Sequence, residues 1–311
     1  MIGTDVAQVA SLLSDGQLAA IPTETVYGLA ANALDPQAVS EIYRVKNRPQ
    51  FNPLILHCAS IDDAKKYVLE WPEEASLLSN AFWPGSISFL LPKSRLVPDL
   101  ITSGSSHVVV RVPNHPLTLD LLSQLDFPLA APSANISNTV SPTTAQHVES
   151  TVGSQIGYVL DGGPCSVGVE STIVAFEDSS VVILREGGIS QEDIVALGIK
   201  VKGNTRKQIQ SPGQLKRHYS TDKPLLIVKN IQDWVHQNPY KKAIALLYEE
   251  KTTPLPYILL SKSYNLGEIA NSLFSGMREA DQSNAEIILA EPIKPEGIGR
   301  AIADRLNRAQ F

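Results

Sequence analysis

The chain has 311 residues, 43% of them hydrophobic and 19% charged, which favours two globular domains with ample material for apolar cores. Its formal net charge of −6 argues against a protein that mainly grips a nucleic-acid backbone, although a local group of cations can still bind a nucleotide. The start of the chain lacks the basic stretch of a secretion signal, and no window approaches about 18 uncharged apolar residues, so we expect no membrane span. The 2 cysteines are too few for a disulfide framework, which favours a reducing, cytoplasmic location.

Helices and strands are predicted in irregular alternation as far as residue 200. Apolar spacing predicts a helix over 5–18, a short strand over 18–22, a strand over 53–57 and a helix over 61–69. A helix also begins at Asp35 and Pro36, because aspartate caps helices and proline suits their first turn. Further strands are expected at 86–91, 108–112, 129–131, 158–160, 171–176 and 181–184. The irregular alternation favours a mixed α/β sheet over a regular doubly wound one.

The pattern changes between residues 200 and 223, where cations, Gly203, Pro212 and Gly213 occur with almost no apolar periodicity. Such a composition is typical of a linker. Beyond it we expect strands at 225–228, 243–247 and 287–289, a helix with Ile269, Leu273 and Met277 on one face, and a helix from about Gly299. The prediction is therefore a domain over 1–203, a linker over 204–222 and a smaller βαβ-type domain over 223–311.

The most conspicuous candidate motif is the run 22–29, Pro-Thr-Glu-Thr-Val-Tyr-Gly-Leu. It places hydroxyls and a carboxylate in a turn directly after a predicted strand, where functional sites are commonly built. The alternative is an ordinary turn whose threonines bond their own backbone. The local sequence by itself favours that alternative.

Lys46 and Arg48 form a second candidate, ahead of Pro49. Two cations at this spacing in a non-helical segment can converge on a phosphate, with arginine supplying a planar fork and lysine a point charge. A basic helix end, favoured by the helix dipole, explains the same residues equally well.

Two further segments have the small, polar composition of ligand-binding loops: 132–137 and the glycine-rich 162–172. The second is not a P-loop, because Val169 and Glu170 stand where lysine and a hydroxyl residue are required. The histidines and cysteines lack zinc-site spacing, no serine-hydrolase elbow is present, and Cys165 is interpreted as a small packing residue. Any nucleotide site must therefore be of another type.

The order and spacing of these motifs resemble those of the YrdC-type family over about residues 5–200. The resemblance is carried by the run 22–29, Lys46-x-Arg48-Pro49, Asn52-Pro53-Leu54, Arg111-x-Pro113, 132–135, Glu170-Ser171-Thr172 and Leu184-Arg185. Ser211-Pro212-Gly213, His218-Tyr219 and residues 223–311 are similar to the long, two-domain form of that family, the L-threonylcarbamoyladenylate synthases. The resemblance implies a YrdC-like twisted mixed sheet with a concave face and a smaller Rossmann-like C-terminal domain.

It also implies a nucleotidyltransferase that converts L-threonine, bicarbonate or CO₂, and ATP with Mg²⁺ into threonylcarbamoyl-AMP and pyrophosphate. Partner proteins would then transfer the threonylcarbamoyl group to tRNA, while stable direct tRNA binding stays open. The resemblance places Thr25, His57, Arg111, Ala131 and Ser171 around threonine, and Arg48, Asn52, His107, Ser133, Ser141, Arg185 and Tyr219 around ATP. It makes Lys46 and Arg48 the catalytic cations, and the linker with Tyr219 is expected to act as a lid.

Several positions depart from the family pattern: Asn47 replaces a usual glycine, Gln50 and Phe51 replace Ser-Asp, and His107 replaces a common threonine. Two other functions compete. Carbamoyl transfer of the hydrogenase-maturation kind is disfavoured by the length and the 2 cysteines. An RNA-binding module without catalysis is disfavoured by the acidic charge and the absence of a basic, aromatic stripe.

Overall fold

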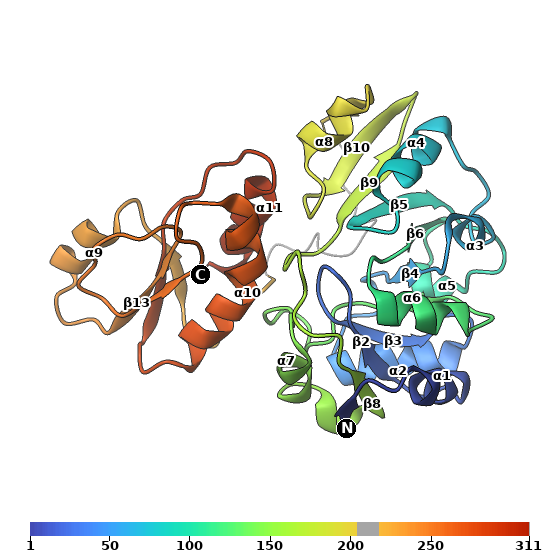
Figure 1. The fold of residues 1–311 in the computed structure, drawn as a ribbon, viewed down its shortest axis with the longest axis horizontal. Coiled ribbons are helices and arrows are strands. Elements are labelled where there is room, and N and C mark those ends of the chain that lie inside the picture. Colours follow the sequence, from blue (N-terminus) through green and yellow to red (C-terminus); the bar gives the residue numbers. More distant parts are fainter. Residues whose placement is uncertain (204–217, 311) are drawn as a thin grey trace.

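The structure is a computed structural model that describes residues 1–203 and 218–310. These residues form two α/β regions, each built on its own sheet (Figure 1). The large region carries the N-terminal part of the chain, and the small region, orange to red in Figure 1, carries the C-terminal part.

The large sheet has the strand order β1-β8-β2-β3-β7-β4-β6-β5-β9-β10-β11. The sheet contains both parallel pairs, such as β4 with β6, and antiparallel pairs, such as β5 with β6, which confirms the predicted mixed sheet. The strands are β1 (Ile2–Gly3), β2 (Ala19–Ile21), β3 (Gly28–Asn32), β4 (Ile55–His57), β5 (Ile87–Pro92), β6 (His107–Arg111), β7 (Leu129–Ala130), β8 (Tyr158–Leu160), β9 (Thr172–Phe176), β10 (Ser180–Arg185) and β11 (Lys200–Lys202).

The helices of this region follow local signals where those are strong. Asp5 caps α1 (Val6–Ser14), and Asp35 caps α2 (Pro36–Lys46) by accepting hydrogen bonds from the amides of Gln37 and Ala38. The remaining helices are α3 (Ile61–Lys65), α4 (Glu73–Phe82), α5 (Asp99–Thr102), α6 (Pro116–Ser123), α7 (Ala145–Glu149), a 3₁₀ turn (Gly153–Gln155) and α8 (Gln191–Ala196).

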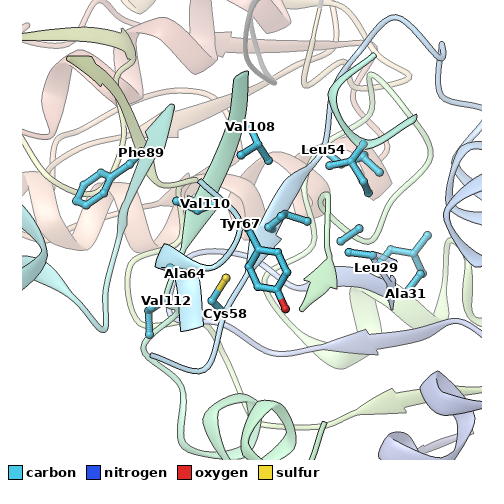
Figure 2. Close-up of a cluster of buried hydrophobic side chains, with 14 of the residues drawn as sticks. Leu29, Ala31, Leu54, Cys58, Ala64, Tyr67, Phe89, Val108, Val110 and Val112 are labelled. Carbon is cyan, nitrogen blue, oxygen red and sulfur yellow. The ribbon is translucent and has the colours of Figure 1, made fainter. Parts of the chain in front are cut away.

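Both faces of the large sheet are buried. Val108 and Val110 of β6 belong to the main core cluster in Figure 2, with Leu29, Leu54 and Phe89. Val109, between them, belongs to a separate cluster on the other face. Burial on both faces explains why these strands read as continuous apolar runs and not as alternating patterns. Cys58 and Cys165 are both buried and free, so the interpretation of Cys165 as a packing residue fits its environment.

The small sheet is entirely parallel, in the order β12-β15-β13-β14. Its elements are β12 (Leu225–Ile227), α9 (Ile231–Gln237), β13 (Ala243–Leu247), β14 (Tyr257–Leu259), α10 (Leu266–Gln282), β15 (Ile287–Ala290) and α11 (Gly299–Ala309). Ile269, Leu273 and Met277 are buried on one face of α10, as predicted, whereas α9 and β14 were not expected. Within the described residues, no helix has the length and apolarity that crossing a bilayer requires.

Helices α10 and α11 lie on the side of the small sheet that faces the large region (Figure 1). The contact is close, because a Cβ on Gly168 would lie 2.5 Å from Cα of Asn271 on α10. Asn271 Nδ2 donates to the carbonyl of Cys165 at 2.6 Å, and the hydroxyls of Thr143 and Ser275 are 2.9 Å apart. The two regions are therefore packed and hydrogen-bonded to each other.

Most of the predicted linker, residues 204–217, lies outside the described residues, and so does the greater part of the expected lid. Just before it, Lys200 and Lys202 form β11, which pairs with β10 in parallel. At its end, Ser220 forms a bridge with Thr139 of the large region.

Candidate active site

One cavity collects side chains from distant parts of the chain. Nine of the predicted site residues line it: Thr25, Arg48, His57, Arg111, Ala131, Ser133, Ser171, Arg185 and Tyr219. They come from strand ends and from loops next to strands and helices, including the loop after α2 that carries Arg48.

The turn at 23–26 combines both interpretations of the first motif. Thr23 Oγ1 donates to the carbonyl of Val26 at 2.7 Å and accepts from the amides of Thr25 and Val26, so it does hold its own turn. Its hydroxyl also lies 2.8 Å from that of Thr25, and both threonines line the cavity. Gly28 follows the turn, and a Cβ there would lie 3.1 Å from the Ala131 Cβ, so glycine permits close approach of these two cavity segments.

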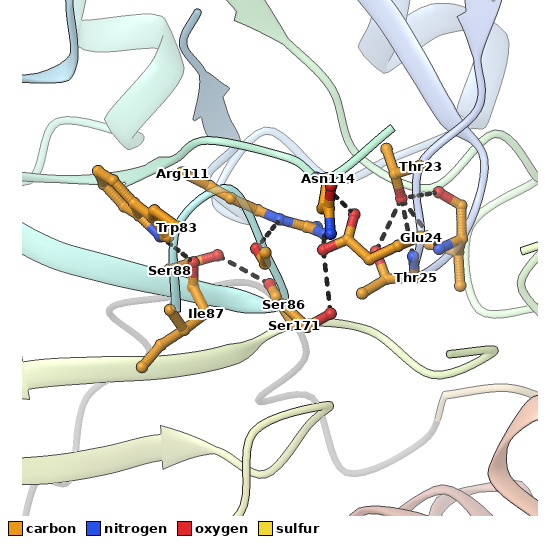
Figure 3. A network of polar contacts seen from close by, with 12 residues as sticks. Thr23, Glu24, Thr25, Trp83, Ser86, Ile87, Ser88, Arg111, Asn114 and Ser171 are labelled. Atoms are coloured by element: carbon orange, nitrogen blue, oxygen red, sulfur yellow. Dashed lines mark hydrogen bonds and ion pairs between the residues drawn. The ribbon is translucent and has the colours of Figure 1, made fainter. Parts of the chain in front are cut away.

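Glu24 is the centre of the polar network in Figure 3. Its Oε1 accepts from Arg111 Nη2 at 2.6 Å and from Ser86 Oγ at 3.0 Å, and its Oε2 accepts from the amide of Asn114 at 3.0 Å. Burial raises the pKa of the Glu24 carboxyl, but Arg111 and the hydrogen bond from the Asn114 amide together hold the pKa below its usual value. Arg111 Nε also donates to the carbonyl of Gly85, so the guanidinium is held at the cavity wall in one orientation.

His57 lies beside this pair at the end of β4. Its side chain is 3% exposed, and Nδ1 is 3.3 Å from the carbonyl of Ile55. Burial, with the nearby charge of Arg111, lowers the pKa of His57 to about 3. The imidazole is therefore neutral at physiological pH and acts as a polar, uncharged wall.

Lys46 and Arg48 are separated by a left-handed residue. Asn47 ends α2 at φ 49°, a conformation that glycine and asparagine adopt most readily, which explains why asparagine can replace the family's usual glycine. The reversal turns both flanking cations inward. Arg48 reaches the cavity, with Nε and Nη2 donating to the carbonyls of Asn52 and Pro53 at 3.1 and 2.8 Å.

Lys46 lies beneath the cavity and does not line it. Its ammonium is fully buried and donates to the carbonyls of Ser133 and Asn135, the second at 2.5 Å. Burial, and then the charge of Arg48, lowers its pKa well below the usual value. Lys46 thus supports the loop that presents Ser133.

Ser171 and Arg185 form the opposite wall. Arg185 Nε donates to the Ser171 carbonyl and Nη2 to its hydroxyl, each at 3.0 Å, and that hydroxyl lies 2.8 Å from Ser88 Oγ. Burial lowers the pKa of Arg48 and of Arg185 to about 10, so both stay charged at neutral pH. No carboxylate among the described residues forms an ion pair with either arginine, whereas Arg111 is paired with Glu24. The cavity therefore presents two arginines that form no ion pair within the described residues, which suits an anionic ligand.

Three predicted nucleotide ligands are not on the cavity wall. Ser141 lies behind it and donates to Glu170 Oε1 at 2.7 Å. Asn52 is buried, with its carbonyl bonded to Arg48 and with Oδ1 lacking a partner among the described residues. His107 lines a different pocket, together with Leu90 and Glu177. His107 is the first residue of β6 and Arg111 is the last, so at the rise of a β-strand the two residues lie about 13 Å apart.

Seven further residues line the cavity without having been assigned to a ligand: Thr23, Val26, Gly28, Ile55, Pro132, Glu170 and His218. Six of them lie inside the motifs at 22–29, 132–135, 170–172 and 218–219, and only Ile55 lies outside them, although it carried a usable signal. Ile55 stands two residues before His57 on β4, so both side chains point to the same face of the sheet.

Fold and cavity together define an α/β protein with a buried, cationic site for a small anionic ligand. Residues 11–187 match a family model described as telomere recombination (Sua5/YciO/YrdC), and residues 189–310 match a model described as threonylcarbamoyl-AMP synthase, C-terminal domain. The chain belongs to the Sua5/YciO/YrdC family, in its two-domain form.

Similar proteins agree over nearly the full length. The threonylcarbamoyl-AMP synthase of Pyrococcus abyssi is 39% identical over 96% of this chain and 92% of its own length. That of Bacillus subtilis is 37% identical over 98% and 92%. The crystal structure of P. abyssi Sua5 complexed with L-threonine superposes with a TM-score of 0.89 at 36% identity, over 98% of this chain and 93% of that one.

Proposed function

We propose that this chain is a threonylcarbamoyl-AMP synthase, which joins L-threonine, bicarbonate or CO₂, and ATP with release of pyrophosphate. The observation that carries the proposal is the convergence of Arg48, Arg111 and Arg185, from three separate segments, on one cavity. The similarity to proteins of this name over nearly the whole chain supports it.

The threonine end of the cavity is built by Thr25, His57, Arg111, Ala131 and Ser171. Arg111 suits the amino-acid carboxylate because a guanidinium fork binds carboxylates at two points, and Glu24 already fixes its orientation. Neutral His57 adds no charge that would repel the threonine ammonium.

The nucleotide end is built by Arg48, Ser133, Arg185 and Tyr219, with Lys46 holding the Ser133 loop from below. In the reaction, the threonine ammonium first loses a proton to water, and the free amine adds to CO₂ and releases a second proton to give a carbamate. A carbamate oxygen then attacks the α-phosphorus, and the bond to the β-phosphate oxygen breaks, so that pyrophosphate leaves. No protein nucleophile is required. Arg48 and Arg185 position the phosphates and neutralise the charge that grows on their oxygens.

Mg²⁺ is proposed to enter with ATP. Glu170, which lines the cavity, and Glu24, which lies behind Arg111, are each bonded to an arginine. The described residues contain no group of three or more His, Cys, Asp or Glu placed to hold a metal. This donor set fits a Mg²⁺ held by phosphate oxygens and water, which is the usual preference of that ion.

The product is a labile mixed anhydride, so we infer that it is handed to proteins that transfer its threonylcarbamoyl group to tRNA. The acidic net charge of −6 favours hand-off over stable tRNA binding by this chain alone. The two buried, free cysteines suit a reducing compartment such as the cytoplasm.

The test is pyrophosphate release by the full chain, with each substrate omitted in turn. We expect release to require threonine, bicarbonate, ATP and Mg²⁺ together. Serine should be used about 10- to 200-fold less well, since one methyl group contributes about 1–3 kcal/mol in a fitted pocket. Equal release without threonine contradicts the proposal, and salt-dependent RNA binding without any turnover favours the RNA-binding alternative.

A further inference from the structure

Arg305 is the largest fully buried side chain of the described residues, and it comes from α11 of the small region. It lies on the helix face that also buries Ala301, Ile302 and Leu306, where an apolar residue is the ordinary choice. Removing a guanidinium from water is costly unless it is fully bonded. The position therefore needs an explanation beyond packing.

The guanidinium of Arg305 reaches into the large region. Its Nε donates to Glu170 Oε2 at 2.9 Å, and its Nη2 donates to the carbonyl of Glu186 at 2.9 Å. Its Nη1 is bonded to neighbouring Asp304 at 2.8 Å, and its central carbon lies 5.3 Å from the centre of the Tyr219 ring. Each nitrogen of the fork is thus used, and its contacts extend to three segments outside α11.

Those three segments all carry cavity residues. Glu170 itself lines the cavity and precedes Ser171, Glu186 follows Arg185, and Tyr219 lines the cavity directly. Arg305 thus holds the ends of the Ser171–Arg185 wall and one face of Tyr219. Through Glu170, whose other oxygen accepts from Ser141 Oγ, the contact reaches the loop at 141 as well.

We propose that Arg305 is a positioning residue of the active site, so that the small region completes the cavity instead of serving only as an attached module. The inference rests on the proposed function. It assigns the C-terminal region a task in that reaction: keeping Glu170, Arg185 and Tyr219 in place while touching no substrate itself.

Electrostatics adds a second effect. Burial raises the pKa of the Glu170 carboxyl, but Arg305 and then Arg185 outweigh it and lower the pKa to about 2. Without Arg305, the buried carboxyl loses its closest cation, and its pKa rises. Protonated Glu170 no longer attracts Arg185. The position of the Ser171–Arg185 wall should then depend on pH in a range where Glu170 of the intact protein stays ionised.

The same helix offers a matched control. Arg300 also reaches across to the large region, where it forms a two-pronged ion pair with Glu192 on α8 at 2.6 and 2.7 Å. That pair is partly exposed, and neither residue lines the cavity. Loss of Arg300 removes a contact between the two regions without touching the cavity wall, whereas loss of Arg305 removes a contact that also holds cavity residues. Comparing the two variants therefore distinguishes an effect on how the regions are attached from an effect on how the site residues are positioned.

The experiment compares Arg305→Met and Arg300→Met in the full chain by threonine-dependent pyrophosphate release between pH 6 and 9. We expect Arg305→Met to lower kcat/KM about 100-fold, because misplacement by about 1 Å has that effect. Its loss should be greatest at pH 6, whereas Arg300→Met stays within about twofold of the unaltered protein at every pH. Arg305→Lys, which keeps the charge without the fork, should restore the pH profile but only part of the rate.

A double-mutant cycle with Glu170→Gln gives the second readout. If Arg305 acts through Glu170, then Arg305→Met costs much less when combined with Glu170→Gln than in the unaltered protein. Wild-type kinetics and an unchanged pH profile in Arg305→Met overturn the inference, and so do equal losses in Arg300→Met and Arg305→Met. If circular dichroism shows that Arg305→Met does not fold, Arg305→Lys takes its place. The double-mutant cycle then combines Arg305→Lys with Glu170→Gln and tests the inference in the same way. An unaltered protein with no threonine-dependent release refutes the proposed function itself, so the two failures are distinguishable.

Discussion

Two buried carboxylate–arginine pairs border the same cavity, and they are built differently. Glu24 and Arg111 both belong to the large region, where the Glu24 carboxylate has three donors: Arg111, Ser86 and the amide of Asn114. Glu170 and Arg305 lie 135 residues apart and join the two regions, with Ser141 as the other donor to Glu170. The side of the cavity that carries Arg111 is therefore held within the large region, whereas the wall of Glu170, Ser171 and Arg185 depends on how the small region packs against it.

The largest effect is expected from breaking the pair within the large region. Arg111→Met leaves the Glu24 carboxylate buried and unpaired, which should lower the free energy of unfolding by about 3–5 kcal/mol and abolish turnover. Urea unfolding followed by tryptophan fluorescence measures the stability, since Trp83 packs against Phe89 in the same region.

The double variant Glu24→Met with Arg111→Met is the control, because removing both charges avoids the unpaired carboxylate. It should regain much of the stability and none of the activity. If Arg305→Met destabilises the protein more than Arg111→Met does, the contrast between a local and an inter-region pair is wrong.

Next in size is the effect of Arg48 on catalysis. Arg48→Ala should lower kcat by about 10²–10³-fold while the fold is kept, since the side chain stabilises charge at the cavity and contributes little to the core. Arg44→Ala is the matched control on the same helix end, because Arg44 is exposed and, within the described residues, forms an ion pair with Glu41 alone. Normal turnover in a folded Arg48→Ala would support the helix-end interpretation and remove Arg48 from the site.

The pH dependence of stability should reveal the buried histidines before any carboxylate. Burial lowers the pKa of His57 and of His218 to about 3, and of His147 to about 4, from an ordinary 6.5. The unfolded chain then binds more protons than the folded one, so the stability contributed by these groups is present above pH 6.5 and is lost as the pH falls below it.

Each such histidine changes the free energy of unfolding by at most about 1.4 kcal/mol per pH unit. Urea unfolding at pH 7, 6 and 5 measures the slope, and His57→Gln should reduce it. His236→Gln, at an exposed position of α9, is the comparison and should leave the slope unchanged. A wild-type slope of zero over this range would contradict the lowered pKa values of these three histidines. Glu170, with a folded pKa of about 2, adds its own loss only between about pH 4.5 and 2.

The smallest effect is expected at Asn47. Asn47→Gly removes a side chain from a left-handed position, so it should change the free energy of unfolding by less than about 1 kcal/mol and leave turnover within about twofold. Asn47→Val is the contrasting variant, because a β-branched residue is strained at this φ. If valine is tolerated as well as glycine, the turn does not hold Lys46 and Arg48 in place.

Local signals predicted much of the fold because each acts within one element. Asp35 and Pro36 define the start of α2, and both β13 and α11 begin at the predicted residues. Strand β3 escaped prediction because Gly, Ala and Asn, which make up most of Gly-Leu-Ala-Ala-Asn, have low strand propensity. Strand β11 escaped prediction because its two lysines have the composition of a linker. The segment is a strand because it pairs with β10, which lies twenty residues earlier in the chain.

By itself, the sequence determined which residue types could build the cavity, because the motifs at 22–29, Lys46–Arg48 and Glu170–Ser171 are contiguous and carry their chemistry locally. Only the tertiary structure decided that Lys46 supports a loop, that His107 lies at the far end of β6, and that Arg305 meets Glu170. The physical reason is that periodicity tells which face of an element is buried but not what covers it. The cation on the apolar face of α11 was visible in the sequence, but its partner was set by the packing of two sheets.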